Sequence, residues 1–223
     1  PPLVRDISPG SGSSTPNSPA AAADLVYFTA WNGGLRGLWR TDGTLAGTIP
    51  LSPSGTIGRI EPLGRGVVFT LWPFAGPMGL YYSDGTQAGT VRLTDLETNS
   101  AGAQTEHLQR VGDRVFATGF FSDRLFVTDG TVAGTFDLSA TMGGPPESLR
   151  DLIAFKGQLV FQGFLAGSGA RLWVSDGTAA GTHERFVPPG GGSLSGNAHT
   201  VMGDLILWNG SDGATTQRLY RTD

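Results

Sequence analysis

Short hydrophobic runs alternate along this chain with stretches rich in Gly, Pro, Ser and Asn. The runs favour Val, Leu, Phe and Thr, and none shows the spacing of an amphipathic helix. Hydrophobic runs bounded by turn residues are typical of β-strands. We therefore predict that the 223 residues form an all-β protein.

One segment recurs through the whole chain. LWRTDGTLAGT occupies positions 38–48, close copies occupy 80–90, 125–135 and 172–182, and LYRTD occupies 219–223. Its aspartates are separated by 42, 45, 47 and 47 residues, at Asp42, Asp84, Asp129, Asp176 and Asp223. This period fits a four-stranded β-propeller blade of about 40–45 residues. We predict a single domain, 1–223, of five blades, spanning approximately 1–48, 49–90, 91–135, 136–182 and 183–223.

Each period divides into four strands separated by tight turns. In the third blade we expect strands over 106–111, 114–120, 124–128 and 135–138, and in the fourth over 152–155, 158–164, 171–175 and 182–186. We expect recurring aromatic and aliphatic residues to fill the space between blades. The second-strand set is Phe28, Phe69, Phe116, Phe161 and Leu207, and the third-strand set is Trp39, Tyr81, Phe126, Trp173 and Tyr220.

The two ends of the chain resemble parts of one repeat. The segment PPLVRDI resembles the residues that follow the Asp-Gly-Thr turn in the other copies. We therefore expect Pro2 to Ile7 to form the outer strand of the fifth blade, beside Leu219 to Thr222. This arrangement closes the ring and removes an exposed sheet edge. The alternative is that the chain is a piece of a longer array.

These repeats resemble a bacterial β-propeller repeat family with the signature ELW-x-[ST]-DGT-x-x-GT. The leading Glu of that signature is absent here, where Gly37, Gly79, Arg124 and Arg171 stand. The repeats are also loosely similar to the Asp-box turns of sialidase-type propellers. The first resemblance implies a propeller from a secreted or surface protein of bacteria, and neither implies an activity.

The repeated aspartates invite a metal or catalytic interpretation, but a structural one accounts for them. An Asp after a strand accepts hydrogen bonds from backbone N–H groups two residues on. Calcium takes six to eight oxygen ligands, whereas each motif offers one carboxylate. We predict structural turns and no metal site, cofactor or catalytic residue. A weak cation site in each blade is the alternative.

Ligand-binding residues are expected where the copies differ. The variable loops precede the first strand of a blade or join its second and third strands, so they share one face of the disc. The aromatic residues of these loops are Trp31, Trp72, Phe74, Phe120, Phe121, Phe164 and Trp208. Polar residues near the starts of the innermost strands give a candidate ring of Ser18, Arg59, Glu106, Arg150 and Asn197, with Glu61, His107, Asp151 and His199 as near neighbours. The alternative is a channel filled by ordered water.

Composition narrows the choice of partner. The formal net charge is −4 and basic residues form no stripe, which argues against nucleic acid and anionic membranes. Cysteine is absent, so disulfides and thiolate metal sites are excluded. No run reaches the roughly 20 apolar residues of a membrane span. The low charge and the Gly/Ser/Thr/Pro-rich loops fit an extracellular or cell-surface setting.

Three functional classes follow. The first is a non-catalytic module that recognises a protein partner on the variable-loop face. The second is a carbohydrate-binding, lectin-like propeller that uses the loop tryptophans. The third is a glycoside hydrolase, which needs two carboxylates at a set separation. Glu61, Glu106 and Asp151 would have to supply them from three blades, and no sequence motif of a known catalytic type accompanies them.

Overall fold

The computed structural model describes residues 3–52, 55–96, 107–119, 123–142, 146–186, 192–211 and 217–222. They form five antiparallel sheets, each made from consecutive strands. Sheet 1 contains β1 (Asn17–Ala22), β2 (Leu25–Asn32), β3 (Leu35–Thr41) and β4 (Ile49–Pro50). Sheet 2 contains β5 (Gly55–Leu63), β6 (Gly66–Pro73), β7 (Gly79–Ser83) and β8 (Thr90–Asp95).

Sheets 3 to 5 repeat this order. Sheet 3 contains β9 (His107–Val111), β10 (Arg114–Thr118), β11 (Leu125–Thr128) and β12 (Phe136–Asp137), followed by a 3₁₀ turn at Ser139–Thr141. Sheet 4 contains β13 (Glu147–Phe155), β14 (Gln158–Leu165), β15 (Gly169–Ser175) and β16 (His183–Phe186). Sheet 5 contains β17 (Leu194–Met202), β18 (Leu205–Ser211) and β19 (Gln217–Thr222). The all-β prediction is confirmed. The strands predicted for the third and fourth repeats lie within about two residues of the observed bounds wherever the structure describes them, except that β13 begins at Glu147 and not at Leu152.

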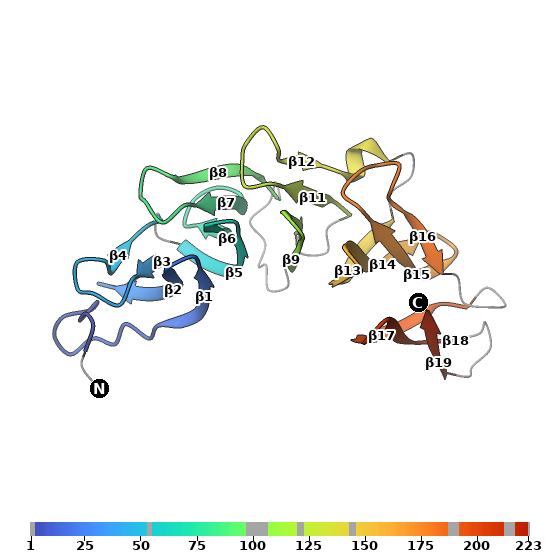
Figure 1. Ribbon diagram of the computed structural model, residues 1–223, viewed down its shortest axis with the longest axis horizontal. Helices are drawn as coiled ribbons and strands as arrows, with labels where there is room; N and C mark the ends of the chain where they lie inside the picture. The colour runs from blue at the N-terminus through green and yellow to red at the C-terminus, as the bar shows by residue number, and fades with distance from the viewer. Residues whose placement is uncertain are drawn as a thin grey trace.

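The five sheets follow one another along an arc, as propeller blades do (Figure 1). The innermost strands are β1, β5, β9, β13 and β17, and the outer strands β4, β8, β12 and β16 lie on the convex side. Sheets 1 and 5 lie at the two open ends of the arc, so the ring is not closed in this structure. No helix among the described residues is long and apolar enough to span a membrane.

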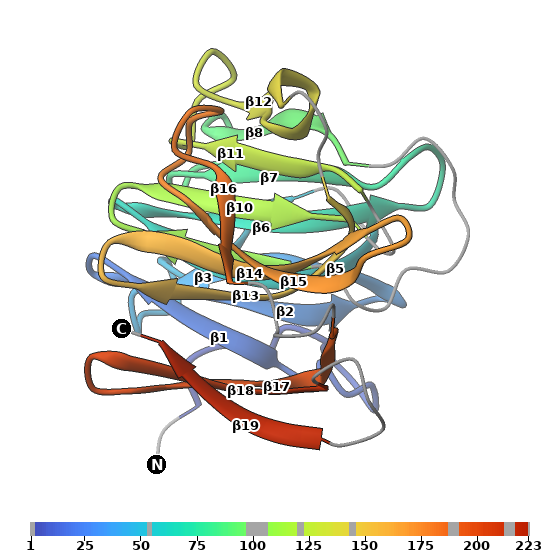
Figure 2. The same ribbon diagram turned by 90° about the vertical axis from the view of Figure 1, so that its right-hand side faces the viewer.

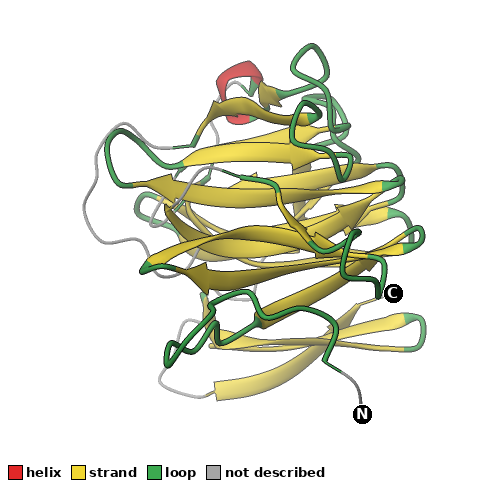
Figure 3. Cartoon of the chain, turned by 90° about the vertical axis from the view of Figure 1, so that its left-hand side faces the viewer, coloured by secondary structure: helices red, strands yellow, loops and turns green. Residues whose placement is uncertain are grey.

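The described connections between strands lie at two opposite edges of the stacked sheets. Figure 2 shows the β13–β14 turn at the left and the β14–β15 connection at the right. Figure 3 shows loops gathered at both edges with strands between them. We name the edge with the strand 1–2 turns and the Asp-Gly-Thr turns the turn edge, and the opposite edge the loop edge. The loop edge is the face predicted to be variable.

The hydrophobic core consists of layers between neighbouring sheets. We call the face of a sheet that meets the next sheet its leading face, and the other its trailing face. Between sheets 1 and 2, Leu38 on the leading face packs in one cluster with Val67, Phe69 and Tyr81 on the trailing face. The rings of Phe69 and Tyr81 stack with centroids 5.4 Å apart. Equivalent layers separate sheets 2 and 3, 3 and 4, and 4 and 5.

The strand register corrects two of the predicted core equivalences. Phe28 pairs with Trp39 and Phe69 with Tyr81, but the matching pairs in sheets 3 and 5 are Ala117–Phe126 and Trp208–Tyr220. Phe116 and Leu207 are therefore one residue out of register and lie on the opposite face. A shift of one residue reverses a strand's side chains.

The predicted closing strand is not formed. Residues 3–7 lie outside any strand, and sheet 5 has three strands within the described residues. Ile7 packs instead with Phe28, Ala30 and Trp39 on the trailing face of sheet 1. The guanidinium of Arg5 donates to the carbonyl oxygen of Thr48 at 2.7 Å. The N-terminal segment is thus held by sheet 1.

Candidate functional site

The repeated aspartates build closed turns. The backbone N–H of Thr44 donates to Asp42 Oδ1 at 2.9 Å, and the Thr44 hydroxyl donates to the same oxygen at 2.7 Å. The Thr44 hydroxyl also accepts from the N–H of Gly47 at 2.9 Å. Matching bonds occur at Asp84, Asp129 and Asp176. Asp223 lies outside the described residues.

The second glycine of each motif is fixed by lack of space. A Cβ added to Gly47 would lie 1.9 Å from Asp42 Oδ1, which no side chain allows. The same conflict arises between Gly89 and Asp84, Gly134 and Asp129, and Gly181 and Asp176. The first glycine is required for its backbone conformation, since Gly43 has a φ of +88°, which residues with a side chain rarely adopt. The carboxylate is therefore enclosed on one side by its own turn.

These bonds favour the ionised carboxyl group. The hydroxyl of Thr44, and next its backbone N–H, lower the pKa of Asp42. Thr131 and Thr178 lower the pKa of Asp129 and Asp176 in the same way. Among the described residues, no three His, Asp or Glu side chains cluster to hold a metal ion. The structural role of these aspartates rests on their hydrogen bonds to Thr and on their contact with the second glycine of the turn.

The predicted polar ring is present in part. Arg59 N donates to Thr70 Oγ1 at 3.0 Å, His107 pairs with Thr118, and Arg150 pairs with Gln162. Since Thr70, Thr118 and Gln162 occupy equivalent positions of the second strands, the three basic residues lie at one level on consecutive innermost strands. Arg59 and Arg150 are exposed, and His107 is half-buried.

Bulges turn the backbone at this same level. The register between first and second strands shifts at Asn17–Ala20, Ile57–Ile60, Arg150–Ile153 and Leu194–His199. Ser18 and Asp151 adopt positive φ values of 52° and 53°. Bulges redirect side chains and are common beside binding sites. At Asp151 the result is a half-buried carboxyl group whose Oδ2 has no hydrogen-bond partner.

Beside Asp151 a small polar cavity opens between sheets 4 and 5. Its volume is about 80 Å³, and its lining includes Ser148, Arg150, Gln162 and Phe164. A cavity of this size admits water or a single small polar group. The described part of the ring therefore presents hydrogen-bond donors from two arginines and a histidine, together with one carboxyl group.

Glu61 lies elsewhere. It pairs with Val68 near the end of β5, close to the strand 1–2 turn, and therefore lies toward the turn edge. Burial raises its pKa, while the backbone and the positive charge of Arg110 oppose this rise. The predicted grouping of Glu61 with the polar ring is wrong, because Glu61 lies two residues beyond Arg59 along β5, toward the strand 1–2 turn.

The loop edge carries exposed aromatic residues from three sheets. Trp31 near the end of β2, Phe74 after β6 and Phe164 near the end of β14 are 39%, 73% and 42% exposed. All three stand at the connection between second and third strands. Trp72 is half-buried in β6. The sequence places Phe74 and Phe164 in or beside the variable loops, and the structure adds that both are exposed.

Trp208 does not belong to this surface. It is fully buried, pairs with Tyr220 and packs against Phe186 with ring centroids 4.8 Å apart. The prediction of a ligand-facing tryptophan was wrong, since Trp208 occupies the position of Phe28 and Phe69. Glu106, Phe120 and Phe121 lie outside the described residues, as do the side chains of Asn197 and His199.

Comparison with known proteins gives a fold and no family. No family model and no curated protein matches the chain. A puromycin hydrolase mutant complexed with PGG aligns over 98% of this chain and 38% of its own, with 16% identity and a TM-score of 0.56. One of two prolyl endopeptidases aligns over 94% and 34%, with 14% identity and a TM-score of 0.58. A puromycin-hydrolyzing peptidase of Mycobacterium tuberculosis aligns over 93% and 35%, with 15% identity and a TM-score of 0.52.

This chain spans less than two fifths of each of those proteins. At such identities the likeness concerns the arrangement of sheets alone. It supports a propeller-like all-β architecture. Their peptidase activities belong to those longer proteins.

Proposed function

We propose that this chain is a five-bladed, non-catalytic interaction propeller of an extracellular or cell-surface protein, and that its loop edge binds a protein partner. The observation that carries the proposal is the exposure of Trp31, Phe74 and Phe164 at the same connection of three sheets. Exposed aromatic residues are enriched at protein interfaces, where they become the buried anchors.

Two further features support a protein partner. The three aromatic residues come from the strand 2–3 connections of sheets 1, 2 and 4, so the exposed surface draws on several sheets rather than on one. Arg59 and Arg150 are exposed on the innermost strands. Arginine pairs well with carboxylates and backbone carbonyls at interfaces. A rigid stack of sheets holds such residues in place at little entropic cost on binding.

The test is selection of peptides from a random phage-displayed library on the folded protein. The first variant combines Trp31→Ala, Phe74→Ala and Phe164→Ala. Its control combines Leu45→Ala, Val132→Ala and Met202→Ala, which removes similarly exposed side chains of 65%, 60% and 58% from the turn edge. We expect affinity for the selected peptides to fall about tenfold or more in the first variant and to change little in the control. Equal losses in both would refute a loop-edge site.

A carbohydrate ligand is the second candidate. Trp31 pairs across the strands with Arg36, whose Nη2 donates to Thr29 Oγ1 at 2.8 Å. An exposed indole beside a fixed guanidinium can stack a sugar ring and bind its hydroxyl groups. A glycan array distinguishes this case: binding that is lost with Trp31→Ala and retained with Phe74→Ala favours a sugar. Hydrolysis of aryl glycosides by the purified protein would overturn the non-catalytic assignment.

A further inference from the structure

The five sheets carry one leucine in equivalent positions on their leading faces. Strand pairing aligns Leu38, Leu80, Leu125, Leu172 and Leu219 opposite matching second-strand residues. The first four are at most 1% exposed, because each enters the layer formed with the next sheet. Leu219 is 70% exposed. The leading face of sheet 5 therefore lacks the cover that every other leading face has.

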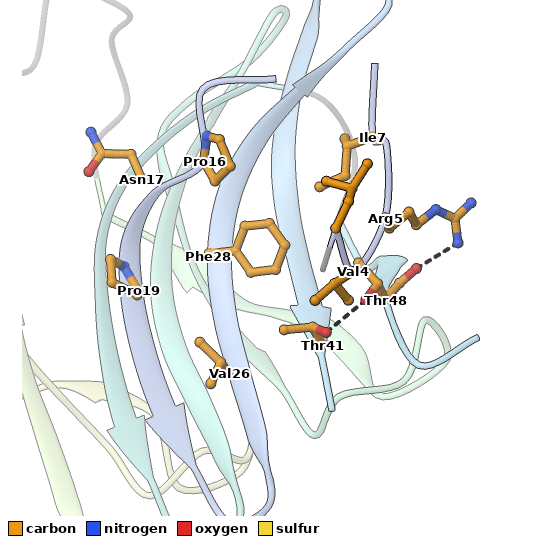
Figure 4. A pocket seen from close by; sticks show the side chains of 11 residues that line it. Val4, Arg5, Ile7, Pro16, Asn17, Pro19, Val26, Phe28, Thr41 and Thr48 are labelled. Carbon is orange, nitrogen blue, oxygen red and sulfur yellow. Dashed lines mark hydrogen bonds between the residues drawn. The ribbon is translucent and has the colours of Figure 1, made fainter. Parts of the chain in front are cut away.

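The trailing face of sheet 1 is also uncovered, at the opposite end of the arc. Val26, Val67, Val115, Leu159 and Ile206 occupy the equivalent position on the five trailing faces. Val26 is 39% exposed, whereas the others are at most 1% exposed. A largely apolar pocket of about 390 Å³ lies here, lined by Val26 and Phe28 of sheet 1 and by Val4 and Ile7 of the N-terminal segment. Figure 4 shows Phe28 in this pocket, with Val4 and Ile7 on one side and Pro16 and Pro19 on the other.

Ile7 shows how a neighbouring sheet would sit there. Leu51, Leu96 and Leu138 each directly follow an outer strand, and each packs in the layer formed with the next sheet's trailing face. Ile7 packs in the same way on Phe28, Ala30 and Trp39 of sheet 1. The N-terminal segment thus lies on sheet 1 as the end of an outer strand lies on the sheet that follows it. The sheet to which that outer strand belongs is absent from this end of the arc.

We infer that the leading face of sheet 5 is the occupant of this surface, with Leu219 seated in the pocket at Val26 and Phe28 of the same chain. Residues 3–6 would then lie beside β19, the free edge of a sheet that has three described strands. The contact repeats the four existing layers, with Leu219 taking the place of Leu38 and Val26 that of Val67. Since the two faces lie at opposite ends of the arc (Figure 1), bringing them together requires a change of angle at one or more of the existing layers.

Pairing within one chain is favoured over pairing between copies. Both faces are held on one polypeptide, so their effective concentration exceeds that of separate molecules in dilute solution. Contacts between copies would be head-to-tail and would grow into larger assemblies unless the rotation closed. This inference adds to the proposed function only the closure of the ring of sheets. The proposed binding site at the loop edge does not require that closure.

Matched alanine substitutions test whether Leu219 is covered. We expect Leu219→Ala to lower the melting temperature as much as Leu172→Ala does, by about 5–15 °C. In an open arc, Leu219→Ala would change the melting temperature by less than about 2 °C. An unchanged melting temperature for Leu219→Ala would overturn the inference. If Leu172→Ala does not fold, a loss of folding with Leu219→Ala also supports it, and normal folding refutes it.

Cysteine pairs identify the partner of Leu219. Because the chain contains no cysteine, the only thiols in a double variant are the introduced ones. Val26→Cys with Leu219→Cys is the test pair, and Leu38→Cys with Val67→Cys is its register-matched control. A cross-linked monomer, formed by oxidation or by a short bis-maleimide, supports the inference. Cross-linked dimers, or no cross-link where the control forms one, overturn it. Peptide binding at the loop edge is scored separately, so either proposal can fail alone.

Discussion

The turn edge and the loop edge of the same sheets differ in how closely the repeats resemble one another. At the turn edge, four described copies of the motif repeat the same bonds between Asp, Thr and Gly, and the polar atoms of each turn satisfy one another. At the loop edge the copies differ, bulges shift the register, and aromatic side chains are exposed. The identical residues therefore stabilise the turns, and the proposed partner site lies among the residues that differ between copies.

The largest effect is expected from a tryptophan that the linear sequence places at the loop edge. Trp208→Ala removes a fully buried ring and should cost about 3–5 kcal/mol of unfolding free energy. Trp31→Ala, at a 39% exposed site, should cost less than about 1 kcal/mol. Chemical denaturation of both variants checks this contrast. Trp208→Phe should be tolerated better than Trp208→Ala, since the indole N–H has no partner. Equal losses for Trp208→Ala and Trp31→Ala would contradict the division between core and surface.

A smaller loss is expected at the turn edge. Gly134→Ala places a methyl group 2.2 Å from the Asp129 carboxyl carbon and expels that carboxylate from its turn. We expect a cost of about 2–3 kcal/mol in denaturant unfolding. Val132→Ala in the same turn is the control, because Val132 is exposed and should be nearly neutral. A neutral Gly134→Ala would show that the turn can reopen at no cost.

Removing one hydroxyl should cost less again. Thr131→Val deletes the group that donates to Asp129 Oδ1 at 2.7 Å and accepts from Gly134 N–H at 2.9 Å. The loss should be about 1–2 kcal/mol, since two hydrogen bonds disappear while the carboxylate keeps its backbone donor. Thr131→Ser retains both bonds and should recover most of the difference. Similar unfolding curves for the Val and Ser variants would argue against the hydroxyl.

The smallest expected effect is the loss of stability at low pH when Asp42 is protonated. The pKa of Asp42 is lower in the folded protein than its ordinary value, chiefly because of the Thr44 hydroxyl. The associated stability is therefore complete above about pH 4 and is lost as the pH falls through the lowered pKa. NMR titration of the Asp42 carboxyl group should show a midpoint below the ordinary value, and Thr44→Val should move it upward. An unchanged midpoint in Thr44→Val would remove the hydroxyl as the cause.

The sequence predicts the strands better than the site, for a physical reason. The motif and its hairpin turns bracket each second and third strand, so their bounds follow from local chemistry. The register of the second strands was wrong in repeats three and five because it was assigned by matching hydrophobic residues. The equivalent residues are those four positions after each strand 1–2 turn, namely Phe28, Phe69, Ala117, Phe161 and Trp208. Counting from the turn would have placed Trp208 in the core.

The polar ring was only partly predictable. Counting back from the second strand gives Arg59 and Arg150, whereas His107 was included only as a neighbour of Glu106, because the count in the third repeat began at the out-of-register Phe116. The bulge at Asp151 has no signal in the sequence, because its positive φ depends on strand pairing rather than on a glycine. Exposure of Phe74 and Leu219 depends on which neighbours cover them, and a single repeat does not contain that information.

The last glycine of the motif, at Gly47 and its equivalents, helps to recognise further copies of this repeat in other sequences. Its backbone lies outside the left-handed region, so an inspection of backbone angles alone would judge alanine acceptable at Gly47 or Gly134, where the carboxylate in fact leaves no room. A search for degenerate copies of this repeat should therefore weight the last glycine as heavily as the aspartate. A copy that lacks both the aspartate and the last glycine should form a turn that does not depend on a carboxylate.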